Sequence, residues 1–219
     1  MFRPPAAEQI QFAGPTGLLE GIVEAPDAGP AIDARQAAAC AVILHPHPLA
    51  GGTMTNKVVH TLARIFQELD VPTLRFNFRG VGASAGSFDA GRGETDDALA
   101  AVAWVRQRWP NRLLWLGGFS FGSFVALQAA ARCNPALLVT VAPPVGRWDF
   151  GEIATPHCPW LIVQGDSDEL VDASAVQQWG ESLNPRPQVT TLPGVDHFFH
   201  GHLHELKKSV LAFARARLT

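Results

Sequence analysis

The sequence predicts an α/β fold in which helices cover both faces of a mostly parallel β-sheet. Short apolar runs, such as CAVIL at residues 40–44, alternate with longer segments whose apolar residues recur at helical spacing. Strands that are apolar on both faces are typical of a parallel sheet buried between two helical layers. The chain has 219 residues, 47% apolar and 17% charged, so we expect a single globular domain over residues 1–219.

The first half of the chain predicts a hairpin followed by two strand–helix steps. Gly14 and Pro15 give a turn signal between two short strand-like runs. Val58 and Leu62 share one face of the first expected helix, and the second ends before Pro110. In chain order, the expected elements are strands 10–13, 17–24 and 40–44, a helix over 56–69, a strand over 72–78 and a helix over 94–109.

The second half predicts four more strands and three more helices. Pro143 and Pro144 close one of these strands, because proline cannot donate to a central ladder. The expected elements are strand 113–116, helix 123–132, strands 137–142 and 160–164, helix 173–183, strand 188–192 and helix 203–218. Only residues 143–159 separate two of the strands, which is too few for a helical cap domain.

The composition argues against nucleic acid and membranes as partners. The net charge of −3 gives no electrostatic reason to expect either, and no apolar run approaches the ~20 residues of a membrane span. The start of the chain, MFRPPAAEQIQF, has no continuous apolar core, so we expect no signal peptide. Cys40, Cys133 and Cys158 show no C-x-x-C spacing and are typical of free thiols in a reducing cytoplasm. The oligomeric state is left open.

The pattern G-x-S-x-G occurs twice, as GASAG at residues 82–86 and as GFSFG at residues 118–122. It surrounds a serine nucleophile on a sharp turn from a strand into a helix. GFSFG directly follows the strand-like LLWLG and directly precedes an alanine-rich helical segment, whereas GASAG runs on into the loop-like SFDAGRG. We therefore expect Ser120 to be a nucleophile and Ser84 to be a loop residue.

The glycines around GASAG also resemble a dinucleotide-binding turn, G-x-G-x-x-x-G at Gly80, Gly82 and Gly86. Such a turn needs a helix that opens at the glycines, whereas the next expected helix starts near residue 94. GGTMTNK lacks the G-K-[ST] ending of a phosphate-binding loop. We expect no nucleotide and no other cofactor.

A serine hydroxyl becomes a good nucleophile only when a base takes its proton and a carboxylate orients that base. In an open parallel sheet these groups come from loops at the carboxyl ends of strands, and GDSDELVD at residues 165–172 is one such loop. Asp172 directly precedes a helix and is explained as its N-cap, and Asp166 could brace its own turn. The residues alone leave Asp166, Asp168, Glu169 and Asp172 as candidates for the acid.

The second loop, PGVDHFFHGH, supplies the base. His197 lies nearest the preceding strand, whereas His200, His202 and His204 belong to the start of the final helix. His202 and His204 are two residues apart and point to different helix faces, and no H-E-x-x-H or cysteine pair is present. We therefore expect His197 to be the base and expect no metal site.

Several segments match one known family. They are HPHPLAGGTMTNK at 45–57, FNFRGVGAS at 76–84, GFSFG at 118–122, GDSD at 165–168 and DHFF at 196–199. Along nearly its full length the chain resembles the α/β-hydrolase superfamily. It is most similar to the small lidless bacterial serine hydrolases, esterase-like relatives of dienelactone hydrolase, that carry an HPHP-x-x-GG segment. The resemblance implies the α/β-hydrolase fold without a cap domain, and it implies that Asp168 is the acid.

A serine hydrolase also needs two main-chain N–H groups that hold the developing oxyanion. The residue after the nucleophile gives one, which is Phe121 here. The other must come from residues 45–50, where Pro46 and Pro48 have no N–H to donate. This leaves His47 or Leu49, and similarity to the family favours His47.

Without a cap the site is expected to be open, with a few apolar walls. The aromatic candidates Trp148, Phe150, Phe88 and Phe198 could equally be ordinary core residues. Of the candidates for substrate contact we select Trp148 and Phe198, together with Leu49. An open cleft suits small esters or thioesters better than long-chain lipids.

The sequence thus predicts a carboxylesterase-type serine hydrolase that acts on a small-molecule ester through an acyl-enzyme intermediate. A thioesterase or a small amide or peptide hydrolase would use the same residues. The alternative from another class is a catalytically silent α/β-hydrolase scaffold that binds a ligand or a protein.

Overall fold

The computed structural model describes residues 6–25 and 39–218 of the chain. In these residues eight strands form one sheet in the order β1-β2-β4-β3-β5-β6-β7-β8. β2 pairs antiparallel with β1 and β4, and the pairs from β4 to β8 are parallel. The strands are β1 (Ala6–Gly14), β2 (Gly17–Ala25), β3 (Ala39–Leu44), β4 (Thr73–Phe76), β5 (Leu113–Phe119), β6 (Leu137–Val141), β7 (Trp160–Gly165) and β8 (Gln188–Leu192).

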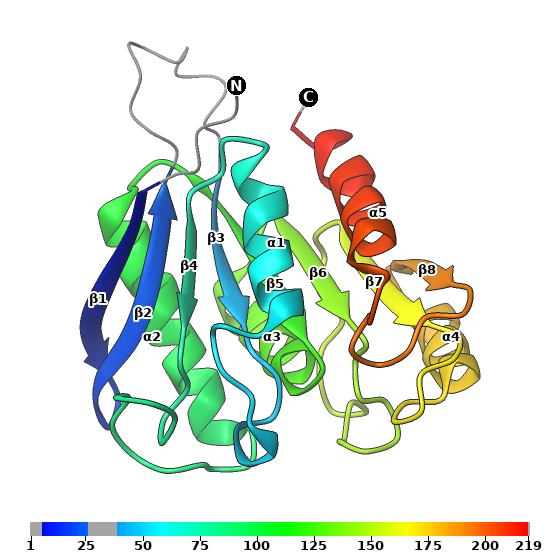
Figure 1. Cartoon of the computed structure of the whole chain (residues 1–219), viewed down its shortest axis with the longest axis horizontal. Helices are drawn as coiled ribbons and strands as arrows, with labels where there is room; N and C mark the ends of the chain where they lie inside the picture. Colours follow the sequence, from blue (N-terminus) through cyan, green and yellow to red (C-terminus); the bar gives the residue numbers. More distant parts are fainter. Residues whose placement is uncertain (1–5, 26–38, 219) are drawn as a thin grey trace.

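Helices cover both faces of this sheet. α1 and α5 pack together on one face, and α2, α3 and α4 lie on the other (Figure 1). The mostly parallel α/β architecture predicted from the alternating apolar runs is confirmed. The helices are η1 (Pro48–Ala50), a single 3₁₀ turn, α1 (Lys57–Gln67), α2 (Arg92–Arg108), α3 (Phe121–Cys133), α4 (Ala173–Ser182) and α5 (Leu203–Arg215).

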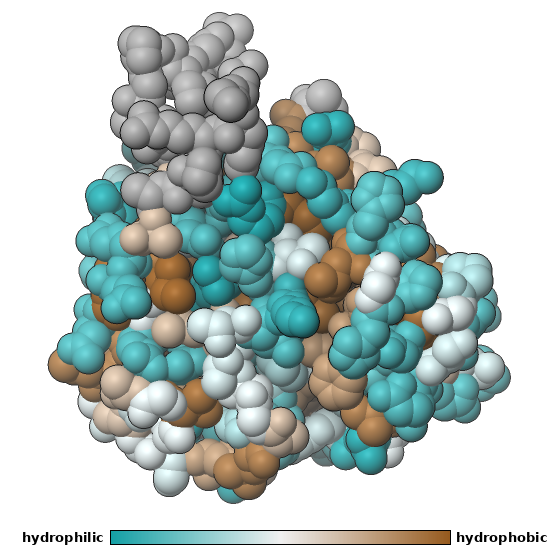
Figure 2. Space-filling model, viewed as in Figure 1, coloured by the Kyte–Doolittle hydropathy of each residue, from teal (hydrophilic) through white to brown (hydrophobic). Residues whose placement is uncertain are grey.

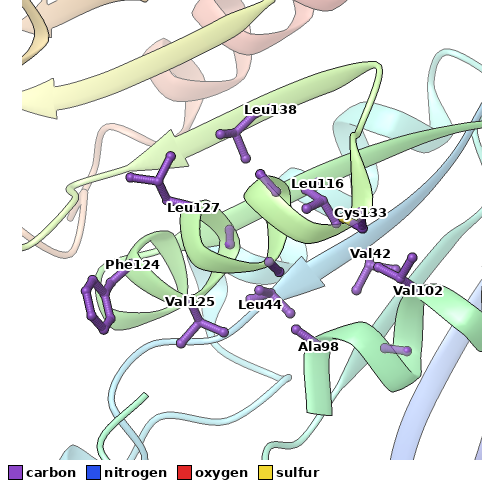
Figure 3. Packing of buried hydrophobic residues seen from close by; sticks show 14 of the residues in the cluster. Val42, Leu44, Ala98, Val102, Leu116, Phe124, Val125, Leu127, Cys133 and Leu138 are labelled. Carbon is purple, nitrogen blue, oxygen red and sulfur yellow. The ribbon is translucent and has the colours of Figure 1, made fainter. Parts of the chain in front are cut away.

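The two cores follow from the alternation of side chains along each strand. In β3, Val42 and Leu44 join the core under α2 and α3, whereas Ile43 joins the core under α1 and α5. α3 packs Val125 and Leu127 into the first core (Figure 3). A strand that feeds both cores must be apolar throughout, which is the continuous pattern seen in CAVIL.

The element boundaries differ from the predictions by a few residues at each end. β1 and β2 are longer than expected, because they pair with each other in an unbroken ladder up to a tight turn between Gly14 and Gly17. α2 begins two residues early, because Glu94 reaches back and accepts a hydrogen bond from the Gly91 N–H at 2.8 Å. The segment 1–12, for which no signal peptide is expected, lies partly outside the described residues.

All parallel strands end at the same edge of the sheet, the lower edge in Figure 1. The loops after β3, β5, β7 and β8 therefore meet there, and they carry the HPHP, GFSFG, GDSD and DHFF segments. Residues 143–159, between β6 and β7, contain no helix. Within the described part of the chain, no helix has the length and apolar character needed to cross a membrane.

Candidate active site

Ser120 lies in the sharp turn between β5 and α3, with φ 53° and ψ −121°. This is a conformation that non-glycine residues rarely adopt and that costs free energy. The flanking glycines allow it: a Cβ on Gly118 would collide with the Gly122 carbonyl, and a Cβ on Gly122 would collide with the Leu44 carbonyl. The strand and the helix thus approach more closely than side chains would permit, and the serine is held at the carboxyl edge of the sheet.

Three side chains from three loops form a continuous hydrogen-bonded chain at this edge. Oγ of Ser120 lies 3.0 Å from Nε2 of His197, and Nδ1 of His197 lies 2.8 Å from Oδ2 of Asp168. His197 is 2% exposed. With Nδ1–H donating to the carboxylate, the free lone pair on Nε2 faces the serine hydroxyl and can accept its proton. The structure brings together the three residues selected from the sequence.

Asp168 is surrounded by donors. Its Oδ2 also accepts a hydrogen bond from Nε2 of Gln164 at 2.9 Å, and its Oδ1 accepts the main-chain N–H groups of Leu170 and Val171, each at 2.8 Å. Burial acts to raise the pKa of the Asp168 carboxyl, but the hydrogen bond and charge of His197, with the neighbouring donors, hold it below its ordinary value. The carboxylate is therefore ionised and can stabilise an imidazolium.

The other carboxylates of this loop hold neighbouring segments. Oδ1 of Asp166 accepts the hydroxyl of Ser167 in its own turn at 3.0 Å and the N–H of Gly194 in the histidine loop at 2.7 Å. Oε2 of Glu169 accepts the N–H of His197 at 3.2 Å, so it fixes the base through the main chain. Asp172 caps α4 as predicted, since its Oδ1 accepts the Ser174 N–H at 2.8 Å. None of the three faces Nδ1 of His197.

Two of the other histidines of this segment pair with nearby acids and not with Ser120. Nδ1 of His200 lies 2.8 Å from Oδ2 of Asp196, and Nδ1 of His202 lies 3.6 Å from Oε1 of Glu205. Both histidines are exposed at the side chain. In the described ranges, no three histidine, cysteine or carboxylate side chains come close enough to hold a metal ion.

His45 fixes the loop that leads to the expected oxyanion donors. It is fully buried, its Nδ1 lies 2.6 Å from the Pro46 carbonyl, and its Nε2 accepts the Phe78 N–H at 3.0 Å. Burial lowers the pKa of the His45 imidazole to about 4, against a smaller opposing effect of the Pro46 carbonyl. The neutral ring thus ties the end of β3 to the end of β4.

His47 and Phe121, the two expected oxyanion donors, lie side by side. Their ring centroids are 5.1 Å apart. Phe121 opens α3, where the first N–H groups of a helix have no partner within the helix. His47 precedes η1 and its carbonyl accepts the N–H groups of Ala50 and Gly52, both at 3.0 Å. The contact between the two side chains places the HPHP segment beside the start of α3.

The His47 ring is part of an aromatic cluster at the site. Its centroid lies 4.9 Å from that of Phe88 and 5.8 Å from that of Trp148. Burial lowers the pKa of the His47 imidazole, an effect partly opposed by the charge of Glu94. Phe150, another expected wall residue, is 7% exposed and packs against Trp179, so it belongs to the core.

Exposed large apolar side chains are few in the described part of the chain, and three of the five lie close in sequence to residues of this site. The face in Figure 2 is mainly hydrophilic with scattered hydrophobic residues. The exposed large apolar residues are Leu18, Leu49, Leu113, Leu170 and Phe198, of which Leu49 (74%), Leu170 (39%) and Phe198 (42%) lie within two residues of His47, Asp168 and His197. The sequence analysis selected Leu49 and Phe198 but missed Leu170, whose position just after Asp168 was the available signal.

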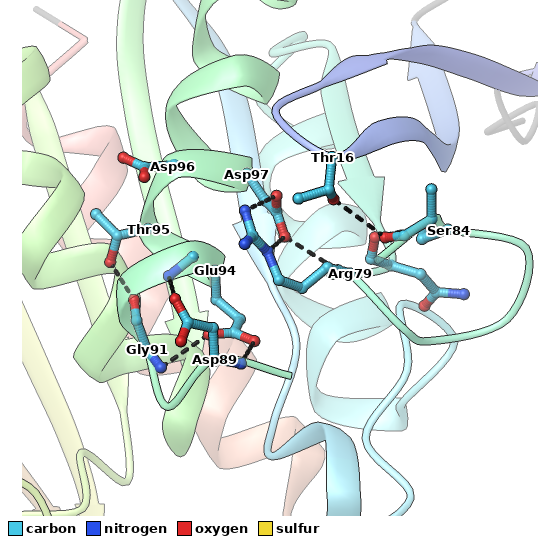
Figure 4. A network of polar contacts seen from close by, with 12 residues as sticks. Thr16, Arg79, Ser84, Asp89, Gly91, Glu94, Thr95, Asp96 and Asp97 are labelled. Carbon is cyan, nitrogen blue, oxygen red and sulfur yellow. Dashed lines mark hydrogen bonds and ion pairs between the residues drawn. The ribbon is translucent and has the colours of Figure 1, made fainter. Parts of the chain in front are cut away.

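The second pentapeptide lies away from the histidine and is a loop, as predicted. Ser84 is 7% exposed, donates to the Asn77 carbonyl at 2.7 Å and accepts the Glu20 N–H at 3.1 Å. A buried ion pair of Arg79 and Asp97, with Nη2 and Oδ1 2.7 Å apart, fixes the start of the loop (Figure 4). The Ser84 hydroxyl is therefore a structural cross-link.

Comparisons with known proteins place this site in context. Residues 39–209 match a family model described as an alpha/beta hydrolase domain. The structure is similar to a serine hydrolase without a lid from Xanthomonas campestris, with 42% identity, a TM-score of 0.90, and 99% of this chain and 97% of that chain covered. A serine hydrolase homologue from Coxiella burnetii is 39% identical, with a TM-score of 0.88 and 97% and 99% covered. An uncharacterised protein of Rickettsia prowazekii is 38% identical over 92% of this chain and 86% of its own length.

Proposed function

The chain belongs to the α/β-hydrolase domain family, and from that premise we propose that it cleaves small carboxylic esters through an acyl-enzyme intermediate. One observation carries the proposal: three side chains form a continuous hydrogen-bonded chain. Oγ of Ser120 lies 3.0 Å from Nε2 of His197, and Nδ1 of His197 lies 2.8 Å from Oδ2 of Asp168. A binding scaffold has no need for a strained serine in contact with a buried, carboxylate-bound imidazole.

The geometry suggests the following steps. Ser120 attacks the acyl carbon while its proton passes to Nε2 of His197, and Asp168 stabilises the resulting imidazolium. The N–H groups of Phe121 and His47 hold the negative oxygen of the tetrahedral intermediate. His197 then gives the proton to the leaving alkoxide, which departs as an alcohol. A water molecule, deprotonated by His197, attacks the acyl-enzyme, the acid is released and Ser120 recovers its proton.

The surroundings of Ser120 favour small substrates. The segment 143–159, where a cap domain would be inserted, forms no helix, and it contributes Trp148 to the wall beside His47. The other apolar groups at the rim, Leu49 and Phe198, are exposed side chains that can cover only a short acyl or alcohol group.

A fluorophosphonate probe tests the proposal without knowledge of the natural substrate, because it reacts only with an activated serine. Wild-type protein should be labelled at Ser120, Ser120→Ala should not be labelled, and the matched Ser84→Ala control should react like wild type. An unlabelled wild-type protein would favour the silent scaffold. A panel of p-nitrophenyl esters, thioesters and aminoacyl amides then separates an esterase from a thioesterase or amidase by kcat/KM.

We also propose that the protein works in a reducing compartment, the cytoplasm. Cys40, Cys133 and Cys158 are free thiols, and burial raises the pKa of each to about 11, which keeps them protonated and unreactive. Recovery of the protein from a periplasmic or secreted fraction would contradict this assignment.

A further inference from the structure

Gln164 is a buried amide in a strand that otherwise carries apolar side chains. β7 has the sequence WLIVQG, all of its residues are buried, and Gln164 is 0% exposed. Burying an amide costs free energy unless its polar atoms are hydrogen-bonded, so a leucine or methionine would suit this position better for packing alone.

The amide of Gln164 is oriented by the acid of the site. Its Nε2 donates to Oδ2 of Asp168 at 2.9 Å and to the Gly165 carbonyl at 3.1 Å, while its Oε1 has no hydrogen-bond partner within the described residues. Turning the amide over would place Oε1 against an ionised carboxylate, which is repulsive. The side chain thus leaves its own oxygen unpaired and gives both donors to Asp168 and the adjoining main chain.

The carboxylate oxygen that Gln164 contacts is the one that faces the base. Oδ2 of Asp168 accepts from both Gln164 and His197, and Oδ1 is held by two main-chain N–H groups. We propose that Gln164 is a positioning residue of the Ser120–His197–Asp168 site: it holds Oδ2 toward the imidazole and takes up part of its negative charge. This inference rests on the proposed function.

Two effects follow if Gln164 loses its donor. The carboxylate is held less firmly, so His197 is oriented less well and serine activation slows. The charge of Asp168 also acts more strongly on the imidazolium, so the acid limb of the pH–rate profile moves to higher pH. The other charged groups near the histidine loop, among the described residues, are unchanged in the variant. They are Asp166 on Gly194, Glu169 on the His197 amide, Asp196 with His200, and Glu205 with His202.

The test is the pH dependence of the rate at which a fluorophosphonate labels Ser120 in Gln164→Met, a variant of similar volume. We expect labelling to slow about 10- to 100-fold, as when a group that orients a functional side chain is removed. The midpoint of the acid limb should move to higher pH by about half a unit to one unit. The thermal stability should not fall. Gln67→Met is the matched control, since Gln67 is also buried but donates to Thr73. It should label like wild type.

The outcomes separate this inference from the proposed function. If wild-type protein is not labelled, the proposed function fails. If wild type is labelled and folded Gln164→Met reacts at the same rate with the same acid limb, the positioning role is wrong. Should Gln164→Met fail to fold, Gln164→Glu replaces it: its carboxylate would repel Asp168 once ionised, so labelling should fall increasingly below wild type as the pH rises, and a wild-type profile would again overturn the role.

Discussion

In GFSFG, Ser120 has a φ of 53° and its hydroxyl faces His197. In GASAG, Ser84 does not have a positive φ, and its hydroxyl is hydrogen-bonded to the main chain of Asn77 and Glu20. The flanking glycines show the reverse: those of GASAG have a positive φ, and those of GFSFG do not. Gly82 and Gly86 have φ of 56° and 90°, so they supply the left-handed turns of a loop.

In GFSFG the glycines are needed because they have no Cβ. Gly118 lets the end of β5 approach the start of α3, and Gly122 lets the start of α3 approach the end of β3. The unusual backbone conformation falls on the serine between them. The same five-residue pattern therefore has two physical solutions. GFSFG holds its serine in an unfavourable backbone conformation that presents the hydroxyl at the edge of the sheet. GASAG places the positive φ angles on glycines and buries its serine hydroxyl. If this difference decides function, substitutions around Ser120 should abolish activity and substitutions around Ser84 should lower only stability.

The largest effect is expected from the two serines themselves. Ser120→Ala should lower kcat for a short p-nitrophenyl ester by at least ~10⁴-fold, since loss of a serine nucleophile costs up to about 10⁶-fold in serine proteases. Ser84→Ala should stay within a few-fold of wild type. An essential Ser84 with a dispensable Ser120 would reverse the comparison.

The next largest effect on kcat is expected from Asp168, the acid that orients His197 beside Ser120. Asp168→Asn should lower kcat by about 10⁴-fold, because the amide favours the wrong imidazole tautomer. Asp166→Asn and Asp172→Asn remove carboxylates that hold Gly194 and the start of α4, so they should mainly lower the melting temperature. Measuring kcat and melting temperature on all three variants separates the roles, and a folded, fully active Asp168→Asn would exclude Asp168 as the acid.

Local context was enough to predict which pentapeptide makes the sharp turn. An apolar strand before GFSFG and a helix directly after it can be read from the order of residues, and so can the nearness of His197 to a strand end. The choice of Asp168 over Asp166 needed the family resemblance, because four carboxylates fall in one short loop. Only the fold shows which of them faces the imidazole and which face the main chain.

Of the two contacts that the sequence analysis missed, one is local, between Gln164 and Asp168, and one is long-range, between His45 and Phe78. Gln164 appears in the sequence as a polar residue at the end of an apolar strand, and the order of residues does not show that the following turn brings Asp168 back against its amide. His45 was interpreted only as part of the HPHP segment, yet its ring joins the end of β3 to Phe78, which lies two residues after β4 and 33 positions away. The His45 contact depends on the strand order, in which β4 lies beside β3.

The buried His45, which joins the ends of β3 and β4, predicts a pH dependence of stability. An unfolded His45 takes up a proton near its ordinary pKa of 6.5, whereas the folded protein resists this until about pH 4. Between these values the unfolded state binds more protons, so the free energy of unfolding should fall as the pH drops from 6.5 to 4. The loss attributable to His45 is about 3 kcal/mol, and it does not grow below pH 4.

Urea unfolding at several pH values measures this effect. His45→Gln should lose the His45 share of the pH dependence, although its stability at pH 7 will be lower. His204→Gln is the control, because His204 is exposed and should leave the profile unchanged. Equal profiles for wild type and His45→Gln would mean that His45 is not the group that resists protonation.

A smaller effect, on the free energy of unfolding, is expected when the hydroxyl of Ser84 in GASAG is removed. Ser84→Ala leaves the Asn77 carbonyl and the Glu20 N–H without their partner in a buried place, which should cost about 1–3 kcal/mol of unfolding free energy. Ser87→Ala, in the exposed part of the same loop, should change it by less than about 0.5 kcal/mol. Equal stabilities of the two variants would show that the Ser84 hydroxyl is not a structural cross-link.

The smallest effect is expected on kcat/KM for each methylene group added to the acyl chain of the substrate. Ser120 is partly exposed, and residues 143–159 place no helix over it, so a bound chain meets only rim side chains such as Leu49 and Phe198. Each methylene buried there contributes at most ~0.8 kcal/mol, about four-fold in kcat/KM, and methylenes beyond the rim contribute nothing. Activity on p-nitrophenyl esters should therefore peak at about two to six acyl carbons and then decline. Phe198→Ala should flatten the rising part of the series and leave acetate hydrolysis nearly unchanged, because only longer chains reach the ring. An optimum at twelve or more carbons would require a covered tunnel next to Ser120, and the contrast between an open serine and a buried one would no longer describe this site.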